Sequence, residues 1–71
     1  MNLRDQINAL VQARSDDEPL DLPEMMGAVG LKHGKKSANV AANEAIRALE
    51  VLGKIHHVHR GDRTGWVPLK P

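Results

Sequence analysis

Three histidines, His56, His57 and His59, stand close together near one end of this 71-residue chain. Imidazole is a good zinc ligand, and alternate residues of a strand, such as His57 and His59, project from the same face. A zinc site needs further ligands, and the chain has no cysteine. His33 or Asp62 completes a site only if the fold brings it close. We therefore predict no metal or other cofactor, and expect these histidines to be solvated or to bind an anion.

The sequence contains no arrangement that is typical of an enzyme. No nucleophile is paired with a base by sequence spacing, and there is no glycine-rich phosphate loop of the Walker type. A domain of 71 residues also has little room for a substrate pocket. We therefore predict that the protein is not an enzyme.

The net charge of +1 conceals a polarised chain. Residues 1–30 hold two basic and six acidic side chains, a balance of −4, whereas residues 31–71 hold eight basic and three acidic ones, a balance of +5. Such asymmetry favours a positive face and a polyanionic partner, although an ordinary solvated surface is the alternative. Lys32, Lys35 and Lys36 surround Gly34, which is a dense group of cations for a mere connector.

The length and composition predict one small domain, residues 1–71, that is held together by its core alone. The apolar residues are almost all aliphatic, with Trp66 as the single aromatic side chain. The apolar runs are too short for a transmembrane helix, and the N-terminal residues do not resemble a signal peptide. We expect a cytoplasmic protein without a membrane partner.

Two short helices are predicted in the first half of the chain. Apolar residues recur with helical spacing from Leu3 until about Arg14, and Asn2 is a suitable N-cap. A second helix begins after Asp21, whose side chain caps it while Glu24 reaches back as in a capping box. Gly30 suits the left-handed conformation that ends a helix.

A third and longer helix is predicted over residues 37–52, followed by Gly53. One face of this helix is apolar, and the opposite face carries polar side chains. Gly27, in the second helix, indicates close packing against a neighbour. The predicted core comprises Leu3, Ile7, Leu10, Met25, Met26, Leu49 and Leu52.

The last third of the chain changes from helical to extended periodicity. Residues 54–60 and 66–69 form two runs that read as strands, and residues 61–65 read as a turn flanked by glycines. We expect Trp66 to pack across this hairpin onto the histidine-rich strand or the core, with stacking on a partner as the alternative.

The order of these elements resembles the winged helix-turn-helix domains of bacterial and phage transcription regulators. The segment LPEMMGAVGL, residues 22–31, is similar to the second helix and turn of that family, and AIRALEVLGKI, residues 45–55, is similar to the end of its recognition helix. The resemblance implies a mainly helical α+β fold with three helices and a C-terminal two-stranded hairpin, the wing, over residues 55–69. The link of residues 32–36 departs from the family in being longer and more basic.

The resemblance also implies double-stranded DNA as the partner and transcription regulation as the role. The third helix would enter the major groove, where Asn39 and Asn43 suit adenine, Arg47 suits guanine or phosphate, and Val40 suits a thymine methyl group. The lysines and the wing arginines would contact the backbone or the minor groove. The implied DNA-binding residues are Lys32, Lys35, Lys36, Ser37, Asn39, Val40, Asn43, Arg47, Arg60 and Arg63.

Other readings of the same residues stay open. Glu44 and Glu50 weigh against a uniformly DNA-facing helix, because carboxylates repel phosphates. A protein-interaction module, such as an inhibitor of a host factor, is the alternative function. Its surface would consist of the acidic region 16–24 with Val40, Val51 and Trp66. A homodimer on a palindromic DNA site is a further expectation, since a domain of this size covers one half-site.

Overall fold

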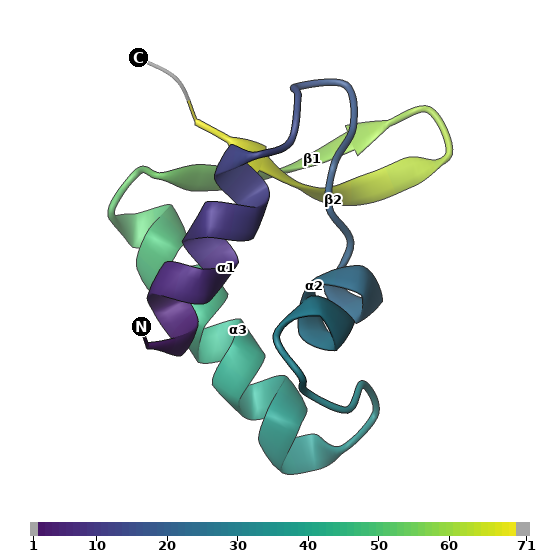
Figure 1. Cartoon of the computed structure of the whole chain (residues 1–71). Helices are drawn as coiled ribbons and strands as arrows, with labels where there is room; N and C mark the ends of the chain where they lie inside the picture. Colours follow the sequence, from purple (N-terminus) through teal and green to yellow (C-terminus); the bar gives the residue numbers. More distant parts are fainter. Residues whose placement is uncertain (1, 70–71) are drawn as a thin grey trace.

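The computed structural model describes residues 2–69 and has three helices followed by one antiparallel hairpin (Figure 1). The expected α+β fold is therefore confirmed. Helix α1 contacts α3 and both strands, so the hairpin closes one end of the helical layer. The elements are α1 (Leu3–Gln12), α2 (Leu22–Ala28), α3 (Lys36–Val51), β1 (Ile55–Arg60) and β2 (Arg63–Pro68).

Helix α1 begins at the predicted cap and ends earlier than predicted. The Oδ1 atom of Asn2 accepts a hydrogen bond of 2.8 Å from the backbone N–H of Asp5. Ile7 and Val11 are buried. The helix ends at Gln12, and the predicted extension to about Arg14 is wrong, because the Arg14 N–H already bonds to the Val11 carbonyl in a tighter turn.

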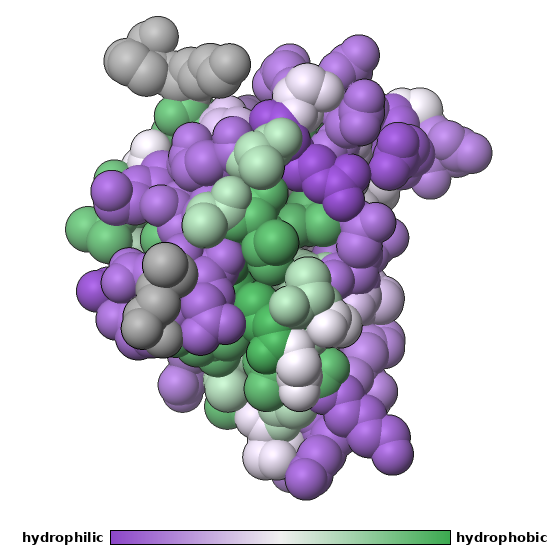
Figure 2. Space-filling model, viewed as in Figure 1, coloured by the Kyte–Doolittle hydropathy of each residue, from purple (hydrophilic) through white to green (hydrophobic). Residues whose placement is uncertain are grey.

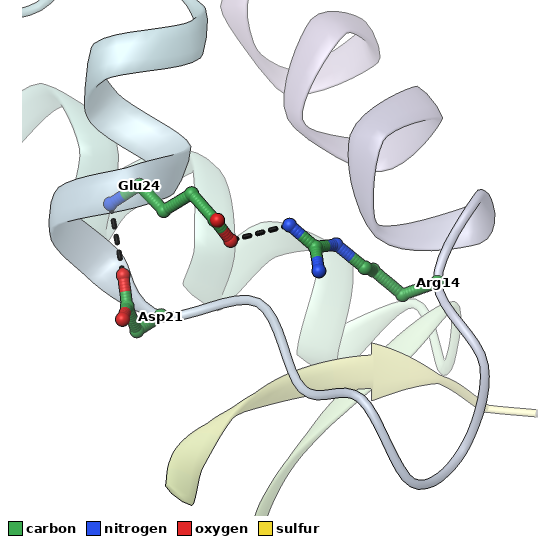
Figure 3. A network of polar contacts seen from close by, with 3 residues as sticks. All are labelled: Arg14, Asp21 and Glu24. Atoms are coloured by element: carbon green, nitrogen blue, oxygen red, sulfur yellow. Dashed lines mark hydrogen bonds and ion pairs between the residues drawn. The ribbon is translucent and has the colours of Figure 1, made fainter.

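Helix α2 is capped by Asp21, as predicted, through a 2.8 Å hydrogen bond from the Glu24 N–H (Figure 3). The Glu24 side chain does not complete a capping box. It reaches across to Arg14, with which it forms an ion pair that joins the start of α2 to the turn after α1. Gly30 follows the helix in the left-handed region, with φ of 80°, as expected.

Helix α3 begins and ends one residue earlier than the predicted 37–52. Ala38, Ala42, Ile46 and Leu49 form its buried face. Leu52 was predicted in the core, but it lies after the last helical residue and is 57% exposed.

The two strands of the hairpin extend further toward the turn than predicted. Its register runs from Ile55 opposite Pro68 to Arg60 opposite Arg63, so the turn is only two residues long. The prediction of a five-residue turn is wrong, and Leu69 lies just beyond β2. Before α2, Leu20 adds an isolated bridge to Trp66 of β2.

The core consists of two clusters of buried apolar side chains. Gly27 does not mark close packing, because a Cβ atom there meets no other atom within 4 Å. None of the described helices is long and apolar enough to cross a membrane. The larger cluster holds Ile7, Val11, Leu20, Met25, Ile46, Leu49 and Ile55, and the smaller one holds Met26, Ala38 and Ala42.

Candidate nucleic-acid interface

The basic link leads directly into the start of α3. Lys32, Lys35 and Lys36 are all exposed, and the Lys35 N–H bonds to the Lys32 carbonyl at 3.2 Å, which closes a turn around Gly34. Gly34 has φ of 94°, a conformation that favours glycine. Two of these lysines line one shallow depression of about 340 Å³, together with Gly30, Leu31, Ser37, Ala38 and Ala41.

The N-terminus of α3 differs from those of α1 and α2. Lys35 occupies the cap position without a side-chain hydrogen bond to the helix, and the first turn of α3 holds no acidic residue. Helices α1 and α2 are capped by Asn2 and Asp21 instead. The partial positive charge of the α3 N-terminus therefore adds to three lysine charges, an arrangement that favours an anion.

A second depression lies between the exposed face of α3 and the hairpin. Val40, Asn43 and Arg47 line this groove of about 450 Å³ together with Trp66 of β2. Three predicted DNA-binding residues are thus brought onto one surface. The predicted packing of Trp66 is confirmed, because its ring lies 4.8 Å from that of His57 and contacts the larger core cluster.

Three other groups around this groove affect what it can bind. Glu44 and Glu50 line it as well, so two carboxylates lie among the polar groups of the α3 face. Phosphate contacts are therefore more favourable at the α3 N-terminus than along its second half. Within residues 2–69, the indole Nε1 of Trp66 is buried without a hydrogen-bond partner.

Asn39 stands apart from the other predicted residues of α3. Its Oδ1 atom accepts a 3.2 Å hydrogen bond from the Gly34 N–H. The amide therefore fixes the link to the first turn of α3, and its acceptor is already engaged in the protein.

The two arginines of the hairpin form a separate group at its tip. Arg60 and Arg63 lie opposite each other in the register, and both are exposed. Arg60 approaches Asp16 at 3.4 Å, and their side chains are 44% and 72% exposed. Exposed pairs contribute only about 0–1 kcal/mol, so Arg60 is readily released to another anion.

Two of the three clustered histidines, His57 and His59, make side-chain contacts within the hairpin. His59 Nδ1 lies 2.6 Å from the Thr64 hydroxyl, across from it in the register, and the His57 ring packs against that of Trp66 with a tilt of 56° between the ring planes. In the described part of the chain, no three His, Asp or Glu side chains are grouped closely enough to hold a metal ion.

A third groove, of about 330 Å³, lies between α1 and α2. Its lining is mainly apolar, and Figure 2 shows a band of hydrophobic surface in this region. No predicted DNA-binding residue lines it. The groove is lined by Gln6, Ala9, Leu10, Ala13, Ala28 and Val29.

Sequence reasoning missed that Trp66 lies beside the exposed face of α3, where it lines one groove together with the largely buried Ile46. The only sequence signal was the position of Ile46 at the edge of the apolar stripe, which does not reveal its neighbour in β2. The chemistry of these side chains carries the functional argument, because comparisons with protein-family models, curated proteins and solved structures found no match to this chain.

Proposed function

We propose that this chain is a double-stranded DNA-binding module, a small cytoplasmic transcription regulator of the winged-helix type. The N-terminal half of α3 enters the major groove, and the hairpin lies on the adjacent backbone or minor groove. The observation that carries the proposal is the start of α3, where three exposed lysines surround a helix N-terminus without a side-chain cap.

The exposed face of α3 supplies groups that suit base edges. Asn43 presents an amide for adenine, and Val40, which is 48% exposed, suits a thymine methyl group. Ser37 at the first turn and Arg47 further along serve phosphate or guanine. Asn39 contributes indirectly, because its Oδ1 atom accepts a hydrogen bond from the Gly34 N–H and so holds the basic link against the start of α3.

The hairpin supplies the second set of backbone contacts. Arg63 has no ion pair within the described residues, and Arg60 exchanges its weak pair with Asp16 for a phosphate. Together with the three lysines of the link, these arginines make five cations that contact the DNA backbone, besides Arg47 of α3. The logarithm of affinity should then fall with the logarithm of salt concentration with a slope of about −4 to −5.

The acidic segment 16–24 is the alternative site, for a protein partner. Several of its carboxylates are used within the chain: Glu24 pairs with Arg14, and Asp21 caps α2, whereas the pair of Asp16 with Arg60 is weak. Asp17 accepts a hydrogen bond from Ser15. These contacts favour DNA over an acidic docking surface as the first function to test.

Fluorescence anisotropy with a labelled random duplex, at several salt concentrations, tests the proposal. We expect the steep negative slope given above, and a slope about 1 unit shallower for Lys35→Ala. Lys54→Ala is the matched control, because Lys54 is an exposed lysine beyond the other end of α3 and should leave the slope unchanged. Weak binding that does not respond to salt would reject the DNA function and favour the protein-interaction module.

A further inference from the structure

Four exposed residues of α3 form a single stripe along the helix. Val40, Glu44, Arg47 and Val51 are spaced by four, three and four residues, which places them on one face. Val40 is 48% exposed and Val51 is 80% exposed, although valine normally contributes to a core. We call these four residues the α3 stripe.

The α3 stripe is complementary to itself when two copies run antiparallel. In that orientation Glu44 faces the second copy's Arg47, and Arg47 faces the second copy's Glu44. The same register sets Val40 against the second copy's Val51 at both ends. A twofold axis generates this kind of matching, in which one patch contacts its own copy.

Neither Glu44 nor Arg47 of the α3 stripe forms an ion pair within the part of the chain that the structure describes. The ion pairs within residues 2–69 join Arg14 to Glu24 and Arg60 to Asp16, so neither involves the stripe. Two opposite charges thus remain available for a second molecule.

The shape around the α3 stripe also suits a second helix. The stripe is a ridge between two shallow grooves of about 450 and 460 Å³, both lined mainly by apolar atoms. Trp66 and Ile46 line one groove, and Ala48 and Leu52 line the other. Helices pack by placing the ridge of one into the groove of the other.

We propose that a second copy of this chain docks antiparallel on the α3 stripe and forms a twofold homodimer. The contact is limited to one helix face and its flanks, so the dimer is weak and depends on concentration. The dimer covers the face of α3 that carries Val40 and Asn43. If the proposed function holds, the dimer and duplex DNA compete for this face, which makes self-association a brake on DNA binding.

Sedimentation equilibrium of the full chain, over concentrations up to about 1 mM, tests the dimer. We expect Glu44→Lys and Arg47→Glu each to weaken association at least about tenfold, because each sets like charges opposite one another. The double variant exchanges the two charges and should restore association. Glu18→Lys makes the same charge change on an exposed loop and should have no effect. A wild-type chain that stays monomeric, or a double variant no better than the single ones, would overturn the dimer.

A second pair of variants separates the dimer from the DNA function. Val51→Gln should weaken the dimer and leave the affinity of the monomer for a duplex unchanged. Lys35→Ala should weaken duplex binding and leave the dimer unchanged. Circular dichroism of each variant checks that α3 is retained. Absence of duplex binding with intact self-association rejects only the DNA function, and duplex binding that does not dissociate the dimer rejects the competition.

Discussion

Leu20 and Trp66 exchange two backbone hydrogen bonds, each 3.0 Å long, which attach the segment between α1 and α2 to β2. Gly65 lies directly beside this bridge. A Cβ atom at Gly65 would come within 2.5 Å of the Leu20 carbonyl oxygen. The bridge thus explains why the strand carries a glycine at this position, because any larger residue would clash with the neighbouring backbone.

Gly65→Ala should therefore destabilise the fold. The added methyl group must separate Leu20 from β2 and lengthen or break the two hydrogen bonds, which should cost about 1–3 kcal/mol. Urea unfolding followed by the fluorescence of Trp66, the single tryptophan, measures the change. An unchanged midpoint would show that the strand shifts freely and that the bridge contributes little.

Gly27→Ala should have the opposite effect. Gly27 lies inside α2, outside the left-handed region, and a Cβ atom there meets nothing within 4 Å. Alanine restricts the unfolded chain and favours the helix, so we expect a gain of about 0.5–1 kcal/mol in the same urea experiment. A loss of stability would reveal a contact that the open surroundings of Gly27 do not indicate.

Local signals in the sequence were sufficient to locate the helices. Asn2 and Asp21 act on N–H groups three residues away, so the starts of α1 and α2 follow from nearby residues. The prediction that Leu52 lies in the core was wrong because it assumed that the local helical pattern continues to this residue. A helical wheel assumes that the helix continues, but α3 ends at Val51 and Gly53 turns the chain with φ of 74°.

Contacts between distant segments could not be predicted in the same way. The Leu20 bridge is made by backbone atoms, and its trace in the sequence is Gly65, which does not reveal the segment that it faces. The pairing of Arg60 with Asp16 and the position of Trp66 beside Asn43 depend on how the hairpin packs against the helices. The exposed face of α3 was predictable from periodicity alone, whereas the groove beside it was not.

Leu49→Ala and Leu52→Ala should differ in their effect on the free energy of unfolding, because Leu49 is buried and Leu52 is exposed just after the end of α3. Leu49 is 2% exposed in the larger core cluster, so its truncation should cost about 2–5 kcal/mol. A domain of this size has roughly 5 kcal/mol of stability, so this variant should retain only about 0–3 kcal/mol and unfold at a much lower temperature. Leu52→Ala should change stability by less than about 0.5 kcal/mol. Similar losses for both variants, measured by thermal unfolding, would contradict the exposure of Leu52.

Ser15→Ala should raise the pKa of Asp17. The Ser15 hydroxyl donates a 2.8 Å hydrogen bond to the Asp17 carboxylate, and this bond, helped by the backbone N–H of Asp17, lowers the pKa of Asp17 below its ordinary value of 3.8. Because the pKa is lower in the folded state, the contribution to stability is present above about pH 3.8 and is lost as the pH falls through the folded value. Carboxyl NMR titration measures the pKa. Ser15→Thr keeps the hydroxyl and should keep the shift, and an unaltered pKa in Ser15→Ala would assign it to the backbone alone.

Asp16→Asn should tighten duplex binding under the proposed function. The substitution removes the carboxylate that pairs with Arg60 at the hairpin tip, and the exposed pair costs little to break. Glu18→Gln changes the net charge equally, but no ion pair of the described residues involves Glu18, so it controls for general electrostatics. We expect the Asp16→Asn variant to bind the duplex up to about fivefold more tightly than the Glu18→Gln variant, as measured by anisotropy at low salt. The difference should vanish in an Arg60→Ala background, because no cation is then left to be released. Equal effects of Asp16→Asn and Glu18→Gln would mean that Arg60 does not reach a phosphate, and the backbone contact of the hairpin would then rest on Arg63.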